Sequence, residues 1–142
     1  MSATHVPAAL RREVHQRALG CCEYCLLCEE DAFFPHEPDH VIALKHGGRT
    51  EADNLALACL ECNRHKGSDL SSIDPRTGDL TPLFHPRTQG WDEHFEVRDG
   101  RIVGTTPVGR VTVALLRFND PARIEARREL ASQRRWPPHR PR

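Results

Sequence analysis

The sequence predicts an α+β fold organised as one compact unit over residues 1–142, and three observations support this expectation. Two Cys-x-x-Cys pairs enclose two short apolar stretches of strand length. Patterns with helical spacing precede the first pair and follow the second. With 38% hydrophobic and 6% aromatic residues, the chain has little material for a core, and a metal site can staple such a core.

The first helix is expected over residues 7–19. Leu10, Val14 and Ala18 recur at a spacing of four, which places them on one helical face. Gly20 is a typical helix stop. The first cysteine pair therefore follows directly after this helix.

Two short strands and a helix are expected between and after the cysteine pairs. A strand end at residues 39–42 and a second strand at 55–58 are separated by the glycine-containing loop 45–50. Thr50 is expected to cap a single turn after this loop. A short helix is expected to begin near Asn63.

An extension over residues 71–142 is expected to follow a core at residues 20–70. It contains an Asp-Gly hairpin signal and then a Thr-Pro step and an Asp-Pro step, each typical of a helix start. The second of these helices is rich in arginine and is expected to run to about Arg135. The residues from Trp136 onward are expected to be a frayed tail.

Charge is balanced in total but uneven along the chain. Residues 1–97 carry nine Lys/Arg against sixteen Asp/Glu, whereas residues 98–142 carry eleven Arg against four Asp/Glu. An arginine-rich helix is either a surface that faces phosphates or an ordinary solvated helix face. The candidates for binding a nucleic-acid backbone on it are Arg123, Arg127 and Arg128.

Four cysteines are expected to bind a structural zinc ion, because two matched pairs supply a closed tetrahedral set that leaves no position for a substrate. The preferred set is Cys22, Cys25, Cys59 and Cys62. Cys28, which has the same spacing from Cys25, and Cys21 are alternative ligands. No apolar run approaches the roughly 18 residues of a membrane span, and no secretory signal is evident at the start. We therefore expect no membrane partner and a reducing, cytoplasmic location, where such cysteines bind metals.

Polar side chains suited to hydrolysis lie between and after the cysteine pairs. Asp39 can bind Mg²⁺, and the adjacent His40 titrates near neutral pH and can take a proton from water. Asn63 offers an amide oxygen to a hard cation or, more simply, caps a helix. His65 lies two residues further on and points to another helix face. Asn54 is either an ordinary turn residue or a side chain that fixes the loop carrying His40.

These residues together resemble the HNH endonuclease family, in the branch with a four-cysteine zinc site. The stretches that carry the resemblance are Cys22–Cys25, Asp39–Ile42, Gly47-Gly48, Asp53–Leu55 and Cys59–Gly67. The sequence departs from the family where a proline often follows the Asp-His stretch, since Ala43-Leu44 stands there. His65 also supplies a literal final histidine, whereas the register favours Asn63.

The resemblance implies a ββα-metal fold and metal-dependent hydrolysis of DNA phosphodiesters. It implies that His40 is the general base and that Asp39 and Asn63 hold one divalent cation, Mg²⁺ or Mn²⁺. It also implies that Asn54 orients the loop of the catalytic histidine. The further residues expected to contact the DNA substrate are Arg64 and Lys66.

The functional hypothesis is therefore a soluble DNA endonuclease with a structural zinc. The alternative is a zinc-dependent nucleic-acid-binding module without catalysis, for which the arginine-rich third is the main support. A third possibility is a thiol-based regulatory zinc domain, supported only by the spare Cys21 and Cys28.

Overall fold

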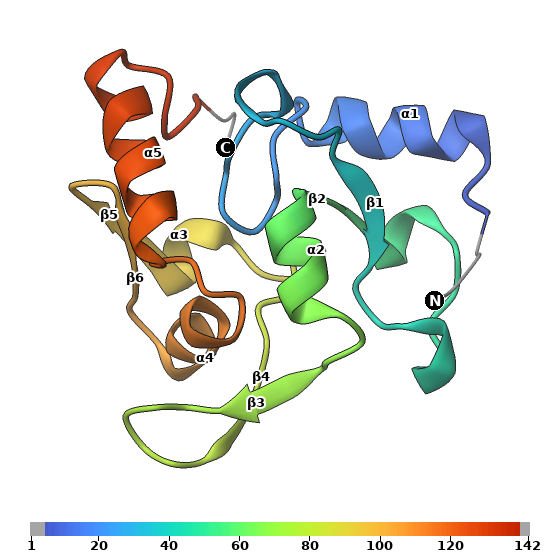
Figure 1. Ribbon diagram of the computed structural model, residues 1–142. Helices are drawn as coiled ribbons and strands as arrows, with labels where there is room; N and C mark the ends of the chain where they lie inside the picture. The colour runs from blue at the N-terminus through green and yellow to red at the C-terminus, as the bar shows by residue number, and fades with distance from the viewer. Residues whose placement is uncertain (1–4, 140–142) are drawn as a thin grey trace.

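The computed structural model describes residues 5–139 and confirms a mixed α+β fold (Figure 1). The main elements are α1 (Ala8–Arg17), β1 (Glu37–His40), β2 (Leu55–Ala58), α2 (Leu60–Lys66), β3 (Ser71–Ile73), β4 (Leu80–Pro82), α3 (Trp91–His94), β5 (Phe95–Arg98), β6 (Arg101–Gly104), α4 (Pro107–Leu115) and α5 (Pro121–Ser132). The strands form three separate antiparallel pairs, β1–β2, β3–β4 and β5–β6. None of the helices in this described part is long and apolar enough to cross a membrane.

The β1–β2 pair forms the centre of the N-terminal half. Asp39 pairs with Ala56 and His40 with Leu55, so the Asp-His dipeptide sits at the end of β1. All four residues of β2 are buried, and Leu55 packs with Val14 of the predicted first helix. The predicted second strand is confirmed. Because β2 is buried and pairs with β1, it fixes the position of the end of β1.

The helix α2 begins earlier than the sequence predicted. Its N-cap is Cys59, whose Sγ accepts a hydrogen bond from the Cys62 backbone N–H at 3.5 Å. Asn63 therefore lies within the helix and is not its cap, so the simpler interpretation of this residue is wrong. The prediction failed because a cysteine sulfur supplies the capping acceptor that Ser, Thr, Asn or Asp supplies in most helices.

The C-terminal half contains the predicted hairpin and helices, together with a strand pair that was not predicted. The β5–β6 hairpin is confirmed, and so is the cap of α4, where the Thr106 hydroxyl accepts from the Gly109 N–H at 3.0 Å. The arginine-rich helix is confirmed as α5. The short β3–β4 pair was not predicted, because its flanking sequence has the composition of a loop.

One core joins the two halves of the chain. It contains both zinc-type cysteine pairs together with aromatic rings from the C-terminal half, including Phe84, Trp91, Phe95 and Phe118. Trp136 belongs to the same cluster, is only 3% exposed, and donates its indole N–H to the Cys25 carbonyl oxygen at 3.2 Å. The expectation of a frayed tail is therefore wrong at Trp136, because this ring finds an apolar pocket and a hydrogen-bond acceptor. The last three predicted tail residues, 140–142, lie outside the described residues.

Candidate active site and metal centre

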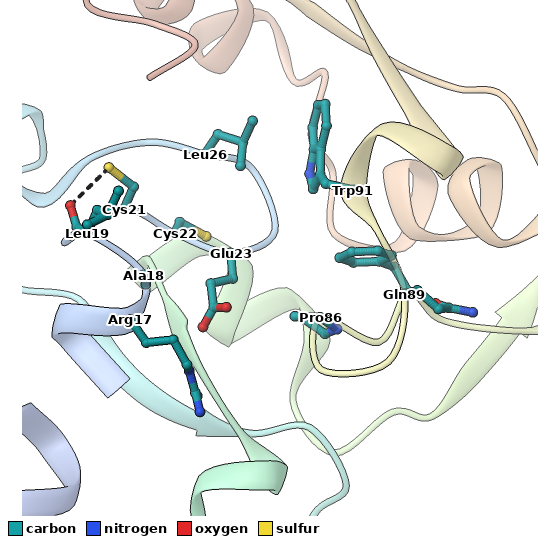
Figure 2. A pocket seen from close by; sticks show the side chains of 11 residues that line it. Arg17, Ala18, Leu19, Cys21, Cys22, Glu23, Leu26, Pro86, Gln89 and Trp91 are labelled. Carbon is teal, nitrogen blue, oxygen red and sulfur yellow. Dashed lines mark hydrogen bonds between the residues drawn. The ribbon is translucent and has the colours of Figure 1, made fainter. Parts of the chain in front are cut away.

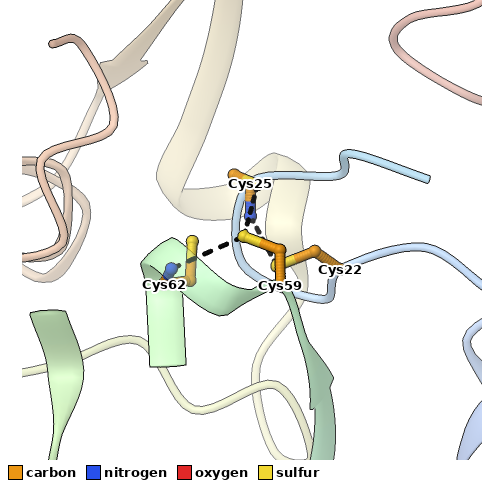
Figure 3. A group of neighbouring side chains, drawn as sticks. All are labelled: Cys22, Cys25, Cys59 and Cys62. Carbon is orange, nitrogen blue, oxygen red and sulfur yellow. Dashed lines mark hydrogen bonds between the residues drawn. The ribbon is translucent and has the colours of Figure 1, made fainter. Parts of the chain in front are cut away.

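The four preferred cysteines converge on one point in the core. The Sγ atoms of Cys22, Cys25, Cys59 and Cys62 all lie within 4.8 Å of one another, and all four residues are buried (Figure 3). The Cys25 and Cys59 sulfurs are 3.7 Å apart. A tetrahedral site with Zn–S bonds of about 2.3 Å has S···S edges of about 3.8 Å. The donor set therefore suits a structural zinc ion.

Each cysteine pair is held in a tight turn by hydrogen bonds to sulfur. Cys22 Sγ accepts from the backbone N–H groups of Tyr24 and Cys25, both at 3.4 Å, and Cys59 Sγ accepts in the same way from Cys62. Burial raises the pKa of the Cys22 and Cys62 thiols well above the ordinary value. A bound cation would offset this cost of ionisation, since metal binding releases the thiol protons.

The two remaining cysteines do not belong to this cluster. Cys21 and Cys28 are joined to each other by a disulfide that closes the chain around the first cysteine pair. The alternative zinc sets that used either residue are therefore wrong. A disulfide was not expected, because the sequence was interpreted as that of a protein in a reducing compartment, where close cysteines bind metals.

Asp39 faces a buried lysine. Asp39 Oδ2 lies 3.3 Å from Lys66 Nζ, and the Lys66 side chain is only 2% exposed. The same ammonium donates to the His40 carbonyl oxygen at 3.0 Å. Burial raises the pKa of Asp39, and the neighbouring Lys66 charge opposes this shift. Lys66 was expected to contact phosphate, but its ammonium group is buried and contacts Asp39 and the His40 carbonyl oxygen at the end of β1.

His40 is supported by a threonine. Its Nε2 atom lies 2.8 Å from the Thr50 hydroxyl oxygen. Thr50 was expected to cap a turn, but the turn that follows is capped at Glu51 without any side-chain hydrogen bond. Burial and then the Lys66 charge lower the pKa of His40, which favours the neutral imidazole. When Nε2 donates to Thr50, the lone pair of a neutral imidazole is on Nδ1.

Asn54 fixes the loop that follows His40, as one interpretation of the sequence proposed. Its Oδ1 accepts from the Ile42 N–H, and its Nδ2 donates to the carbonyl oxygens of Ile42 and Arg49, each at 2.9 Å. Gly48 packs against the same group so closely that a Cβ there would lie 1.7 Å from the Ile42 oxygen. The two ends of the loop are thus tied to one buried amide.

Asn63 lies on α2 between the metal centre and the lysine. It follows Cys62 directly and precedes Lys66 by three residues, so Asn63 and Lys66 share one helix face. Because Lys66 contacts Asp39, this face of α2 is turned toward the end of β1. His65 is two residues beyond Asn63 and Arg64 is exposed. Asn63 therefore lies next to the cysteine cluster in the chain, on the helix face that also carries the lysine paired with Asp39.

The arginines proposed to bind DNA have other partners. Arg123 is 9% exposed and donates to Cys62 Sγ at 3.1 Å, while Arg127 is 3% exposed and donates to the Gly100 and Phe118 carbonyl oxygens. Although burial opposes it, the cysteine charges raise the pKa of Arg123. The prediction is therefore wrong for these two residues, because their helix face packs on the core. Arg128 remains half exposed, but it pairs with Asp99.

A pocket of about 260 Å³ lies next to the first cysteine pair. Its lining includes Cys21, Glu23, Leu26 and Trp91 (Figure 2). His40 is not among the lining residues, so this pocket is separate from the candidate active site.

The fold and the two neighbouring sites define a small α+β domain in which a four-cysteine centre supports a polar site at the end of β1. Residues 22–69 match the family model described as HNH endonuclease. The resemblance seen in the sequence is thus confirmed for the segment that carries both sites. No curated protein and no solved structure matches the chain.

Three contacts at these sites could not be predicted from the sequence. They are Thr50 with His40, Lys66 with Asp39, and Arg123 with Cys62. Each contact joins segments that are separated in sequence, and no local sequence pattern predicts it.

Proposed function

We propose that this protein is an endonuclease that hydrolyses DNA phosphodiester bonds with the help of one divalent cation. The observation that carries the proposal is the environment of His40 within a segment matched by the HNH endonuclease model. A neutral imidazole whose Nε2 atom is held by the Thr50 hydroxyl suits a general base. The proposed base is Nδ1, which would accept a proton from the attacking water.

Asp39 and Asn63 are the proposed ligands of the catalytic cation, Mg²⁺ or Mn²⁺. Asp39 Oδ2 is buried, and its only close partner in the described part of the chain is Lys66 Nζ at 3.3 Å, with no hydrogen bond formed. A carboxylate oxygen is a ligand type that Mg²⁺ prefers. The cation, when bound, would stabilise negative charge on the scissile phosphate and the leaving oxygen. Lys66 supplies a positive charge at the same carboxylate and would help to keep it ionised.

The proposed DNA-facing surface is the rim of this site. Lys45 and Arg49 are exposed on the loop after β1, and Arg64 is exposed on α2. His46 Nε2 lies 3.1 Å from the Ser68 carbonyl oxygen, which holds this loop beside the end of α2. These side chains replace Arg123 and Arg127 as the proposed phosphate contacts. We further propose the ββα-metal arrangement for β1, β2 and α2, within a catalytic core at residues 20–70 and an extension at 71–142.

The test is nicking of supercoiled plasmid in a series of divalent cations, with His40→Ala as the variant and His65→Ala as the matched control. We expect Mg²⁺- or Mn²⁺-dependent nicking that His40→Ala abolishes and His65→Ala retains, with one zinc per chain in all three proteins. DNA binding without cleavage by the wild type in every cation would instead support the non-catalytic binding module.

A further inference from the structure

The zinc-type centre is contacted by a side chain from far along the chain. Arg123, in the first turn of α5, donates from Nη2 to Cys62 Sγ at 3.1 Å and lies 4.0 Å from Cys59 Sγ. Its other terminal nitrogen donates to the carbonyl oxygens of Leu116 and Arg117, at 2.8 and 3.1 Å. The guanidinium is therefore held between the α4–α5 connection and the second cysteine pair.

The first cysteine pair is contacted by the same C-terminal segment. Trp136 donates its indole N–H to the Cys25 carbonyl oxygen at 3.2 Å. The Arg127 guanidinium lies 5.3 Å from the centre of the Trp136 ring, a cation–π distance. Arg127 is itself anchored on the Gly100 and Phe118 carbonyl oxygens, at 2.7 and 2.5 Å. In Figure 1 the chain after α5 accordingly returns toward the loop of the first cysteine pair.

We propose that α5 and the residues up to Trp136 form a clamp that retains the structural zinc ion. We call Arg123, Arg127 and Trp136 the C-terminal clamp. Arg123 is its positioning residue at the second cysteine pair, and Trp136 is its positioning residue at the first. The inference concerns zinc retention and holds whether or not the protein cleaves DNA.

The chemical reason is charge. Four thiolates around Zn²⁺ carry a net charge of −2, and in this protein they are buried. A charge-assisted hydrogen bond from a buried guanidinium compensates part of that charge and lowers the tendency of the Cys62 sulfur to leave the metal. The indole–carbonyl contact restrains the backbone turn that carries Cys25. Release of zinc would then require the clamp to open on both sides.

The primary test is the rate of zinc release to an excess of a chromogenic chelator from the full-length, zinc-loaded protein. The variant is Arg123→Gln, and the matched control is Arg128→Gln, which removes a guanidinium from the exposed side of the same helix. Loss of partners around metal ligands typically weakens metal binding about 10–100-fold. We expect zinc release to accelerate by about this factor in Arg123→Gln and to stay unchanged in Arg128→Gln, with partial rescue in Arg123→Lys.

A spectroscopic measurement separates this role from general destabilisation. In the Co²⁺-substituted protein, loss of a hydrogen bond to a thiolate should shift the sulfur-to-cobalt charge-transfer band to lower energy in Arg123→Gln. Trp136→Phe keeps a ring but removes the N–H donor, so it tests the clamp even where Arg123→Gln fails to fold. Zinc release at the wild-type rate in the folded Trp136→Phe variant, or in folded Arg123→Gln, would overturn the proposal.

Discussion

Replacing Asn54 by alanine tests how this protein holds its proposed general base. The substitution removes three hydrogen bonds, two to Ile42 and one to Arg49, and leaves three partly buried backbone groups without these partners. At about 0.5–1.5 kcal/mol net for each bond, the free energy of unfolding should fall by about 1.5–4.5 kcal/mol. Because Ile42 follows His40 by two residues, the loop should also lose its fixed path.

The assay is single-turnover plasmid nicking at saturating enzyme, paired with urea unfolding of the same samples followed by tryptophan fluorescence. Nicking is measured without urea, where the variant remains folded. We expect the rate constant of Asn54→Ala to fall at least about tenfold. A tenfold fall corresponds to a loss of about 1.4 kcal/mol of transition-state stabilisation. DNA affinity should change little, since the Asn54 side chain is buried and bonded to the backbone of its own loop.

The chain contains a matched control for this variant. Asn119 makes the same pair of contacts with Ile102, accepting from its N–H at 3.0 Å and donating to its carbonyl oxygen at 2.8 Å. Asn119 lies in the C-terminal half, away from His40, so Asn119→Ala should destabilise the protein while preserving nicking. Equal nicking by folded Asn54→Ala and the wild type, or an equal loss of nicking in both alanine variants, would show that Asn54 does not position His40.

Three further predictions concern charge, thiols and DNA. Burial and the Lys66 charge lower the pKa of His40, so nicking should decline only as the pH falls below the usual histidine range; Lys66→Gln should raise that pKa and move the acid limb of the pH–rate profile to higher pH. An unmoved limb would show that the lysine charge does not act on the base. The double variant Cys21→Ala/Cys28→Ala should still contain one zinc per chain by elemental analysis, because neither residue belongs to the cluster, and a zinc-free product would contradict the assignment. Arg64→Gln should reduce the slope of log K against log salt for DNA binding by about one, whereas an identical slope would remove this residue from the interface.

Several local features could be predicted from the sequence because neighbouring residues supply their cause. The two Cys-x-x-Cys turns are made by sulfur acceptors and N–H donors only two or three residues apart. The Thr106 cap and the β5–β6 hairpin likewise depend on adjacent residues. Predictions failed where a residue could satisfy two roles. Cys59 serves both as a member of the metal cluster and as a helix cap, and this moved the start of α2 three residues upstream of Asn63.

The arginines of α5 show the limit of such reasoning most clearly. An arginine-rich helix has the same composition whether its guanidinium groups face DNA or the core. The cysteines of the proposed metal centre, their pairing by short turns and the candidate histidine could all be identified without the structure, because these features depend on local spacing. The contacts of Arg123 with Cys62, of Lys66 with Asp39 and of Trp136 with Cys25 became visible only in the folded chain. Each of these contacts joins segments that are far apart in sequence and that core packing brings together. Burial then fixes the charged group or ring against one partner.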